Sequence, residues 1–203
     1  MKAVLASLKP YYYYLVGEGI KKIEARKTYP KADDWNRETY FYMSKDKQSF
    51  ARIPKEYQDK YRKHFGKVGL KWKCSEIEPL TDYDLLYGLD EISNSDIEEQ
   101  SCVDIDELLR YKGKNDFLYA WHISDLVIYD EPKLLSEFTM IDVEAVKQCK
   151  DRERVYTDPI YTNNAFLLGG YICNKGETDW CSKCKTKLLT RPPQSWCYVE
   201  EKE

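Results

Sequence analysis

Three charged side chains that could do chemistry lie close together near the start of the chain. Lys21, Glu24 and Arg26 follow a glycine turn at Gly17 and Gly19. An arginine can bind a phosphate with its planar guanidinium, and a desolvated lysine can act as a base or nucleophile. On a strand, Glu24 and Arg26 share a face and could form a buried pair, with Lys21 on the other face. The remaining interpretation is a surface strand of alternating charge.

Cysteines form a second group with chemical potential. Cys181 and Cys184 form a CxxC motif, Cys173 lies shortly before it, and Cys149 lies further back. Four thiolates in a tetrahedral array bind zinc, and such a site can fold a segment too polar to fold on its own core. We therefore predict one structural zinc ion held by these four cysteines. Free thiols and a redox-active CxxC are the alternatives.

The two histidines do not suggest a catalyst. His64 ends a basic segment, where we expect it to be solvated, and His122 lies in an apolar run, where we expect it to be structural. The sequence has no Ser/His/Asp spacing, no phosphate-binding P-loop and no HExxH motif. Most familiar enzyme classes are therefore unsupported.

Charge is distributed unevenly along the chain. Residues 1–73 carry 18 Lys and Arg against 8 Asp and Glu, a net +10, whereas residues 74–131 carry a net −13. A basic first third suits an anionic ligand such as a nucleic acid. Two ordinary solvated surfaces that pair with each other would give the same pattern, so charge alone does not decide.

The elements that must position these residues are mostly short strands. Apolar alternation or β-forming runs predict strands at 2–8, 20–26, 38–44, 67–77, 117–129 and 194–200. Helices are expected at 10–16, 53–65, 104–110, 134–138 and 143–148. Residues 94–101 show no clear pattern and are expected to be mobile. This pattern predicts an α+β fold built on an antiparallel β-barrel with short flanking helices.

Several of these segments resemble the ASCH domain family of the PUA-like superfamily, of bacterial and phage type. The string Gly19-x-Lys21-x-x-Glu24-x-Arg26 resembles the family signature, and SLKP at 7–10 resembles its first strand and helix entry. KVGLKWKCSEI, AWHISDLVIYDEP and PPQSWCYVEE resemble its later strands. The resemblance implies one PUA-like barrel domain over residues 1–203, with insertions at about 45–65 and 88–115 and a cysteine-rich insertion at 142–190.

The resemblance also implies a ligand cleft between the barrel and the first helix. It implies RNA or nucleotide binding there, by the residues Ser7, Lys9, Lys21, Glu24, Arg26 and Trp196. Some family members are hydrolases, so a ribonuclease or an amidohydrolase acting on modified nucleosides is the first alternative. In that case Lys21 and Glu24 are the catalytic residues. Lys21 should otherwise stay charged, because the glycine turn leaves it open to water.

A second alternative is a phage-type adaptor that binds a protein through the acidic block at 74–131. No apolar run approaches the roughly 20 residues that a membrane-spanning helix needs. The first residues also lack the long apolar run of a signal peptide. The sequence therefore predicts a cytoplasmic protein with no membrane partner.

Overall fold

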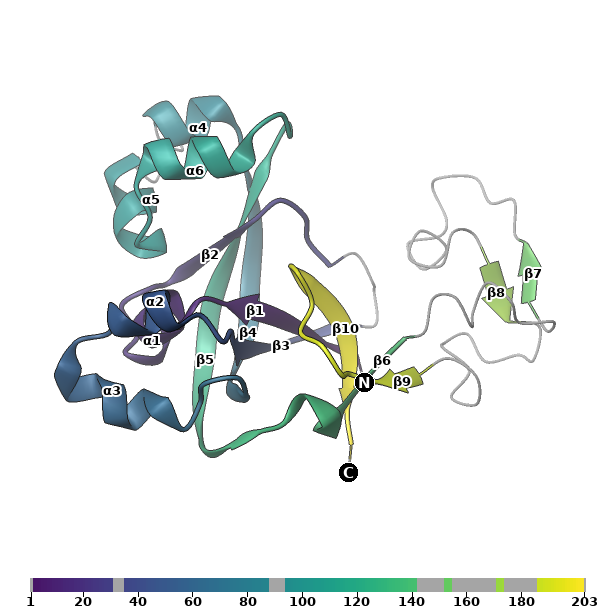
Figure 1. The fold of residues 1–203 in the computed structure, drawn as a ribbon. Coiled ribbons are helices and arrows are strands. Elements are labelled where there is room, and N and C mark those ends of the chain that lie inside the picture. Colours follow the sequence, from purple (N-terminus) through teal and green to yellow (C-terminus); the bar gives the residue numbers. More distant parts are fainter. Residues whose placement is uncertain are drawn as a thin grey trace.

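The protein is built on one large mixed sheet (Figure 1). The computed structural model describes residues 2–30, 35–87, 94–141, 152–154, 171–173 and 186–202. In chain order, the elements are β1 (Lys2–Leu8), α1 (Pro10–Gly17), β2 (Ile23–Arg26), β3 (Trp35–Met43), α2 (Lys47–Ala51), α3 (Lys55–Arg62), β4 (Val68–Leu80), α4 (Asp82–Tyr87), α5 (Asn94–Ser101), α6 (Ile105–Lys112), β5 (Leu118–Lys133), the 3-10 turn η1 (Leu135–Glu137), β6 (Phe138–Ile141), β7 (Arg152–Arg154), β8 (Tyr171–Cys173), β9 (Thr186–Leu188) and β10 (Trp196–Glu201). The predicted α+β class is correct.

The prediction of a closed antiparallel barrel is wrong for the described residues. Eight strands lie in the order β2-β5-β4-β3-β1-β10-β6-β9, so the sheet has two open edges. One pair, β1 with β3, is parallel. No further strand pairs with the β2 edge in the described residues. Next to that edge, helix α5 contacts the chain: the Lys22 amide donates to the Gln100 carbonyl at 2.7 Å. Within the described ranges, β7 and β8 pair only with each other.

Both faces of the sheet are buried around β1. Alternate residues of a strand point to opposite faces, and Val4 packs with Phe41 and Trp72 on one face while Leu5 packs with Tyr40 on the other. All five are at most 3 % exposed. The first face is covered by α1, whose Tyr13 and Val16 are fully buried. The β1–α1 unit therefore lies at the centre of the fold.

Helices α4, α5 and α6 form a lobe at one end of the long strands β4 and β5 (Figure 1). The lobe has its own apolar cluster, in which Leu85, Ile97 and Leu108 pack against Ile23 and Leu118. Residues 94–101, expected to be mobile, are helix α5. Ile97 is 2 % exposed, so α5 is held by packing against residues far away in the sequence.

Most other predicted elements are found within a few residues of their expected positions. The strand expected from residue 20 begins only at Ile23, and the helix expected at 134–138 is the single 3-10 turn η1. The helix expected at 143–148 lies outside the described residues. Among the helices in the described ranges, none has the length and apolar character to cross a bilayer.

Candidate functional site

Lys21 lies in the turn that joins helix α1 to strand β2. The helix ends at Gly17, and Gly19 has φ of +67°, a conformation that glycine adopts without strain. The amides of Ile20 and Lys21 then both donate to the Leu15 carbonyl, at 2.8 and 3.0 Å. Lys21 is therefore held by the backbone of α1, two residues before β2 begins.

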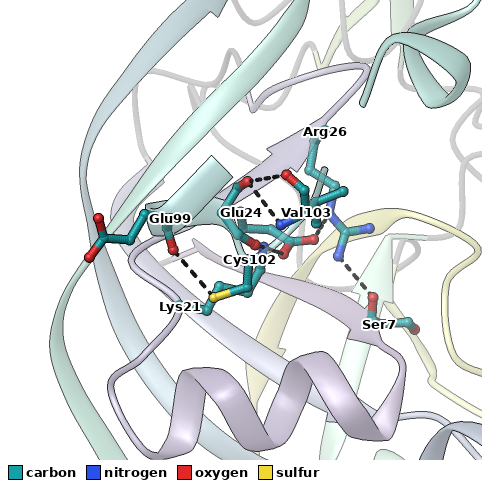
Figure 2. A network of polar contacts seen from close by, with 8 residues as sticks. Ser7, Lys21, Glu24, Arg26, Glu99, Cys102 and Val103 are labelled. Carbon is teal, nitrogen blue, oxygen red and sulfur yellow. Dashed lines mark hydrogen bonds and ion pairs between the residues drawn. The ribbon is translucent and has the colours of Figure 1, made fainter. Parts of the chain in front are cut away.

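Glu24 joins Lys21 and Arg26 in one buried network (Figure 2). Its two carboxylate oxygens lie 3.4 Å from Lys21 Nζ and 2.9 Å from Arg26 Nε. The Lys21 ammonium also donates to the Ser101 carbonyl, at the end of α5. The three charged residues are between 2 and 6 % exposed. The single carboxylate of Glu24 thus forms an ion pair with each of the two buried cations.

The Arg26 guanidinium is fully committed within the protein. Besides its ion pair with Glu24, Nη2 donates to the Ser7 carbonyl at 2.8 Å and Nη1 to the Ser195 carbonyl at 3.2 Å. The Ser7 hydroxyl donates to the Pro193 carbonyl at 2.8 Å. These contacts connect β1, β2 and the segment before β10. In this arrangement Arg26 could bind a phosphate only by giving up one of its protein partners.

Two expectations about Lys21 are wrong. The strand begins after Lys21, so the alternation of faces does not apply to it and its side chain reaches Glu24. Its side chain is also closed to water, with only 2 % exposed. Burial lowers the pKa of the Lys21 ammonium, Glu24 opposes that change, and the net shift is downward. The structure thus brings the two residues of the hydrolase alternative into contact.

An aromatic and cationic surface leads outward from this network. The Lys21 ammonium lies 5.5 Å from the centre of the Tyr12 ring, and the Tyr11 and Tyr12 rings are 5.8 Å apart. The exposed Arg52 guanidinium stacks on Tyr11 at 4.1 Å. Burial raises the pKa of Tyr12, and the Glu107 carboxylate adds to the rise. We call Tyr11, Tyr12 and Arg52 the tyrosine platform.

The platform continues into a basic face formed by α2, α3 and the residues around them. Residues 45–67 contain eight Lys and Arg against three Asp and Glu. The exposed cations of this face are Lys45, Lys47, Arg52, Lys55, Lys60, Arg62 and Lys63. This region was expected to be an insertion, and all the predicted ligand contacts lie outside it. Its spacing of lysines and arginines was visible in the sequence, but its position beside α1 was not.

The other two predicted ligand contacts, Lys9 and Trp196, differ in exposure. Lys9 is exposed directly before α1. Trp196 is half-buried: its indole N–H donates to the Thr28 hydroxyl at 3.0 Å, and its ring packs near Trp121 and Tyr198. Part of the Trp196 ring is therefore used for packing, which leaves less of it for a stacked base.

His64 is not solvated as expected but fully buried. Its Nδ1 lies 3.0 Å from the Tyr13 hydroxyl, within a group of tyrosines on α1 and α3. A Cβ atom at Gly69 would overlap this pair, so glycine is needed there for close approach. Burial, together with the nearby charges of Lys63 and Lys60, lowers the pKa of His64 to about 4. His122, partly exposed, lies 2.8 Å from Glu78.

The zinc prediction falls largely outside the described residues. Cys149, Cys181 and Cys184 lie there, and of Cys173 only the backbone, in β8, is described. Among the side chains that are described, no group of three His, Cys, Asp or Glu could hold a metal ion. Zinc therefore stays a prediction.

The chain was also compared with known proteins. It is similar in structure to the ASCH protein from Zymomonas mobilis, with 13 % identity, a TM-score of 0.41 and coverage of 84 % of this chain and 96 % of that chain. Two point mutants of that protein match at 13 and 12 % identity, also with TM-scores of 0.41, over 85 and 84 % of this chain and 100 and 96 % of theirs. No family model and no curated protein matches.

Proposed function

We propose that this chain binds RNA or a nucleotide-like ligand, with bases on the tyrosine platform and phosphates on the basic face. The observation that carries the proposal is Arg52 stacked at 4.1 Å on the half-buried Tyr11, beside a face rich in exposed cations. Aromatic rings stack on bases at roughly 1–3 kcal/mol per base, and arginine adds cation–π attraction. Such a surface suits a single strand or an unpaired base.

The buried network supports this surface from below. Glu24 and Arg26 fix β2 against β1, and Lys21 is held beneath Tyr12. Lys9, exposed at the start of α1, adds a cation beside the first tyrosine. In this proposal Ser7, Glu24 and Arg26 position the site, while Lys9, Tyr11 and Arg52 contact the ligand. Trp196 contributes at most a partly exposed ring.

The test is a titration of labelled single-stranded RNA at two ionic strengths. We expect affinity that falls with salt, and a further loss of about tenfold in Tyr11→Ala/Arg52→Ala, the value of one stacked base. Lys114→Ala is the matched control, because Lys114 is exposed near the acidic lobe. Absent binding, or equal losses in the control, would reject the site.

A hydrolase acting at Lys21 is the second candidate, and one observation favours it. Lys21 is buried beside Glu24, and its pKa is lowered, as a lysine base or nucleophile requires. The ion pair with Glu24 favours the charged form of Lys21 instead, because a neutral amine would leave Glu24 with only Arg26 as its charged partner. Lys21 is also covered by Ser101, so substrate would have to displace part of the lobe.

The hydrolase is tested with RNA and with acylated nucleosides as substrates. Turnover by the wild type that disappears in Lys21→Arg would favour it, because arginine stays protonated. Lys22→Arg is the control, since Lys22 is the exposed neighbour. If neither substrate is turned over, the binding function alone remains.

We further propose that Cys149, Cys173, Cys181 and Cys184 hold one structural zinc ion. The support is the spacing of four thiols in a polar segment, which zinc could fold. Metal analysis of protein purified without chelator should give about one zinc per chain, in line with a single closed four-cysteine site. Cys181→Ser should lower this content, and Cys197→Ser should not, because Cys197 lies within β10. Zinc-free protein would reject the proposal.

A further inference from the structure

The short helix α4 carries the most exposed aromatic side chains of the described residues. Tyr83 is 67 % and Tyr87 is 71 % exposed, and Leu86 beside them is 47 % exposed. The two tyrosines lie one turn apart and their ring centres are 4.9 Å from each other. Single exposed apolar residues are ordinary, but a contiguous group on one helix is typical of a binding surface.

The backbone of helix α4, which carries the two rings, is held by contacts within the protein. The Asp84 carboxylate accepts from both the amide and the hydroxyl of Thr81, at 2.7 Å each, and so caps the start of the helix. Leu85 is fully buried in the lobe, and the buried Lys112 ammonium lies 2.9 Å from Asp82. A rigid element loses little conformational entropy when it binds a partner.

The lobe around this helix is strongly acidic. Its described residues from 82 to 116 include nine Asp and Glu against three Lys and Arg. Of the three cations, Lys112 is buried and paired with Asp82. The fully exposed carboxylates of the lobe are Asp82, Glu99, Asp104, Asp106, Glu107 and Asp116. A surface of this sign repels nucleic acid and attracts a cationic partner.

We propose that Tyr83 and Tyr87 form a docking site for an arginine- and lysine-rich protein segment that carries an apolar or aromatic anchor. Charge complementarity identifies this occupant: the lobe that carries the two rings has nine Asp and Glu against three Lys and Arg, and arginine can stack on a ring face or pair with a carboxylate. The anchor would pack on the tyrosines and Leu86, where neutral area is exposed. Tyr83 and Tyr87 share no residue with the tyrosine platform on α1, so neither proposal depends on the other.

The experiment uses two labelled synthetic peptides of equal positive charge. One carries a tryptophan and leucines between its arginines, and the other carries serines in their place. Fluorescence anisotropy with the full chain should show tighter binding of the first peptide. Tyr83→Ser/Tyr87→Ser should weaken that binding about tenfold or more, as for anchor residues of an interface. Both positions are exposed, so the melting temperature should not change.

Val127→Ser/Leu134→Ser is the matched control, because these side chains are 49 and 52 % exposed outside the lobe. It should bind both peptides like the wild type. Equal affinity for the two peptides, or an equal loss in the control, would overturn the proposal. So would concentration-dependent self-association abolished by the tyrosine substitutions, since the occupant would then be a second copy. RNA binding lost in the same variant would assign the face to RNA instead.

Discussion

Charged side chains have opposite roles at strand β2 and at helices α2 and α3. At β2, Lys21, Glu24 and Arg26 are almost fully buried and use their charges on one another. At α2 and α3 the lysines and arginines are exposed, and the ion pairs that they form, such as Lys60 with Glu18 and Arg62 with Asp59, lie at the surface. The sequence pattern is alike in the two regions, yet only the second leaves its charge available to a ligand. Charge density in a sequence therefore does not locate a binding surface until burial is known.

The largest effect that separates the two regions should come from Glu24→Gln. Removing this carboxylate leaves Lys21 and Arg26 buried without a counter-charge, which costs about 3–5 kcal/mol of the free energy of unfolding. Urea unfolding at neutral pH measures the loss. Glu56→Gln, on the exposed side of α3, is the control and should change stability by less than about 0.5 kcal/mol. A Glu24→Gln protein as stable as the wild type would mean that the network does not hold the fold.

The sequence predicted the chemical partners in the network better than their geometry. A buried pair of Glu24 and Arg26 was one of the two alternatives for these residues, beside phosphate binding by Arg26, and the two side chains do pair. Lys21 was assigned to the opposite face because the strand was started at residue 20, whereas the Gly19 turn delays it to Ile23. That delay depends on hydrogen bonds to the Leu15 carbonyl, which a count of alternating residues does not contain.

The fold was predictable where a segment has its own periodicity and not where long-range packing decides. The strands β4 and β10 alternate in sequence, β1 and β5 are mostly apolar runs, and all four were found. Helix α5 was missed because its one buried apolar residue, Ile97, gains its stability from Leu85 and Leu108 of neighbouring helices. The surroundings of the β2 edge likewise depend on the lobe, because Ile23 packs against lobe residues that are far from it in the sequence. His64 was missed for the same reason, since its pocket is built by Tyr13, Tyr61 and Gly69.

A second prediction, with a smaller expected effect on stability, concerns the pH dependence caused by His64, which is buried beside the exposed lysines of α3. Its pKa is about 4 in the folded chain and near 6.5 when unfolded, so the unfolded state takes up the proton first as pH falls. Stability should therefore drop between about pH 6.5 and 4, by about 2–3 kcal/mol from this group. His64→Gln should flatten that slope in urea titrations.

His122→Gln is the control for this pH dependence, because the partly exposed His122 lies beside Glu78 outside the tyrosine group. Each variant removes one histidine, so a slope that flattens more in His64→Gln than in His122→Gln would assign the effect to the buried residue. If His64→Gln keeps the full slope, His64 is not the group responsible. The loss would then come from other groups, and the lysines of α3 would have no effect on the buried region.

The smallest effect should come from the half-exposed pair at the boundary of the two regions. Glu18 accepts from Lys60 at 2.7 Å and from the Tyr61 hydroxyl at 2.6 Å. Burial raises the pKa of Glu18, but these two hydrogen bonds outweigh it and the net shift is downward. Glu18 therefore contributes stability at neutral pH that is lost as the pH falls through its folded pKa. Because Lys60 is 46 % exposed, Lys60→Met should cost only about 0.5 kcal/mol.

A double-mutant cycle with Glu18→Gln and Lys60→Met, followed by urea unfolding at neutral pH, measures this coupling. We expect less than about 1 kcal/mol, as for exposed ion pairs. Glu18→Gln alone should cost more than Lys60→Met alone, because it also replaces the charged acceptor of the fully buried Tyr61 hydroxyl with a weaker, neutral one. A coupling energy as large as the loss of stability from Glu24→Gln would contradict the idea that only the buried charges at β2, and not the exposed charges of α3, stabilise the fold. It would show that the lysines of α3 stabilise the fold, and they would then be less available to bind phosphate.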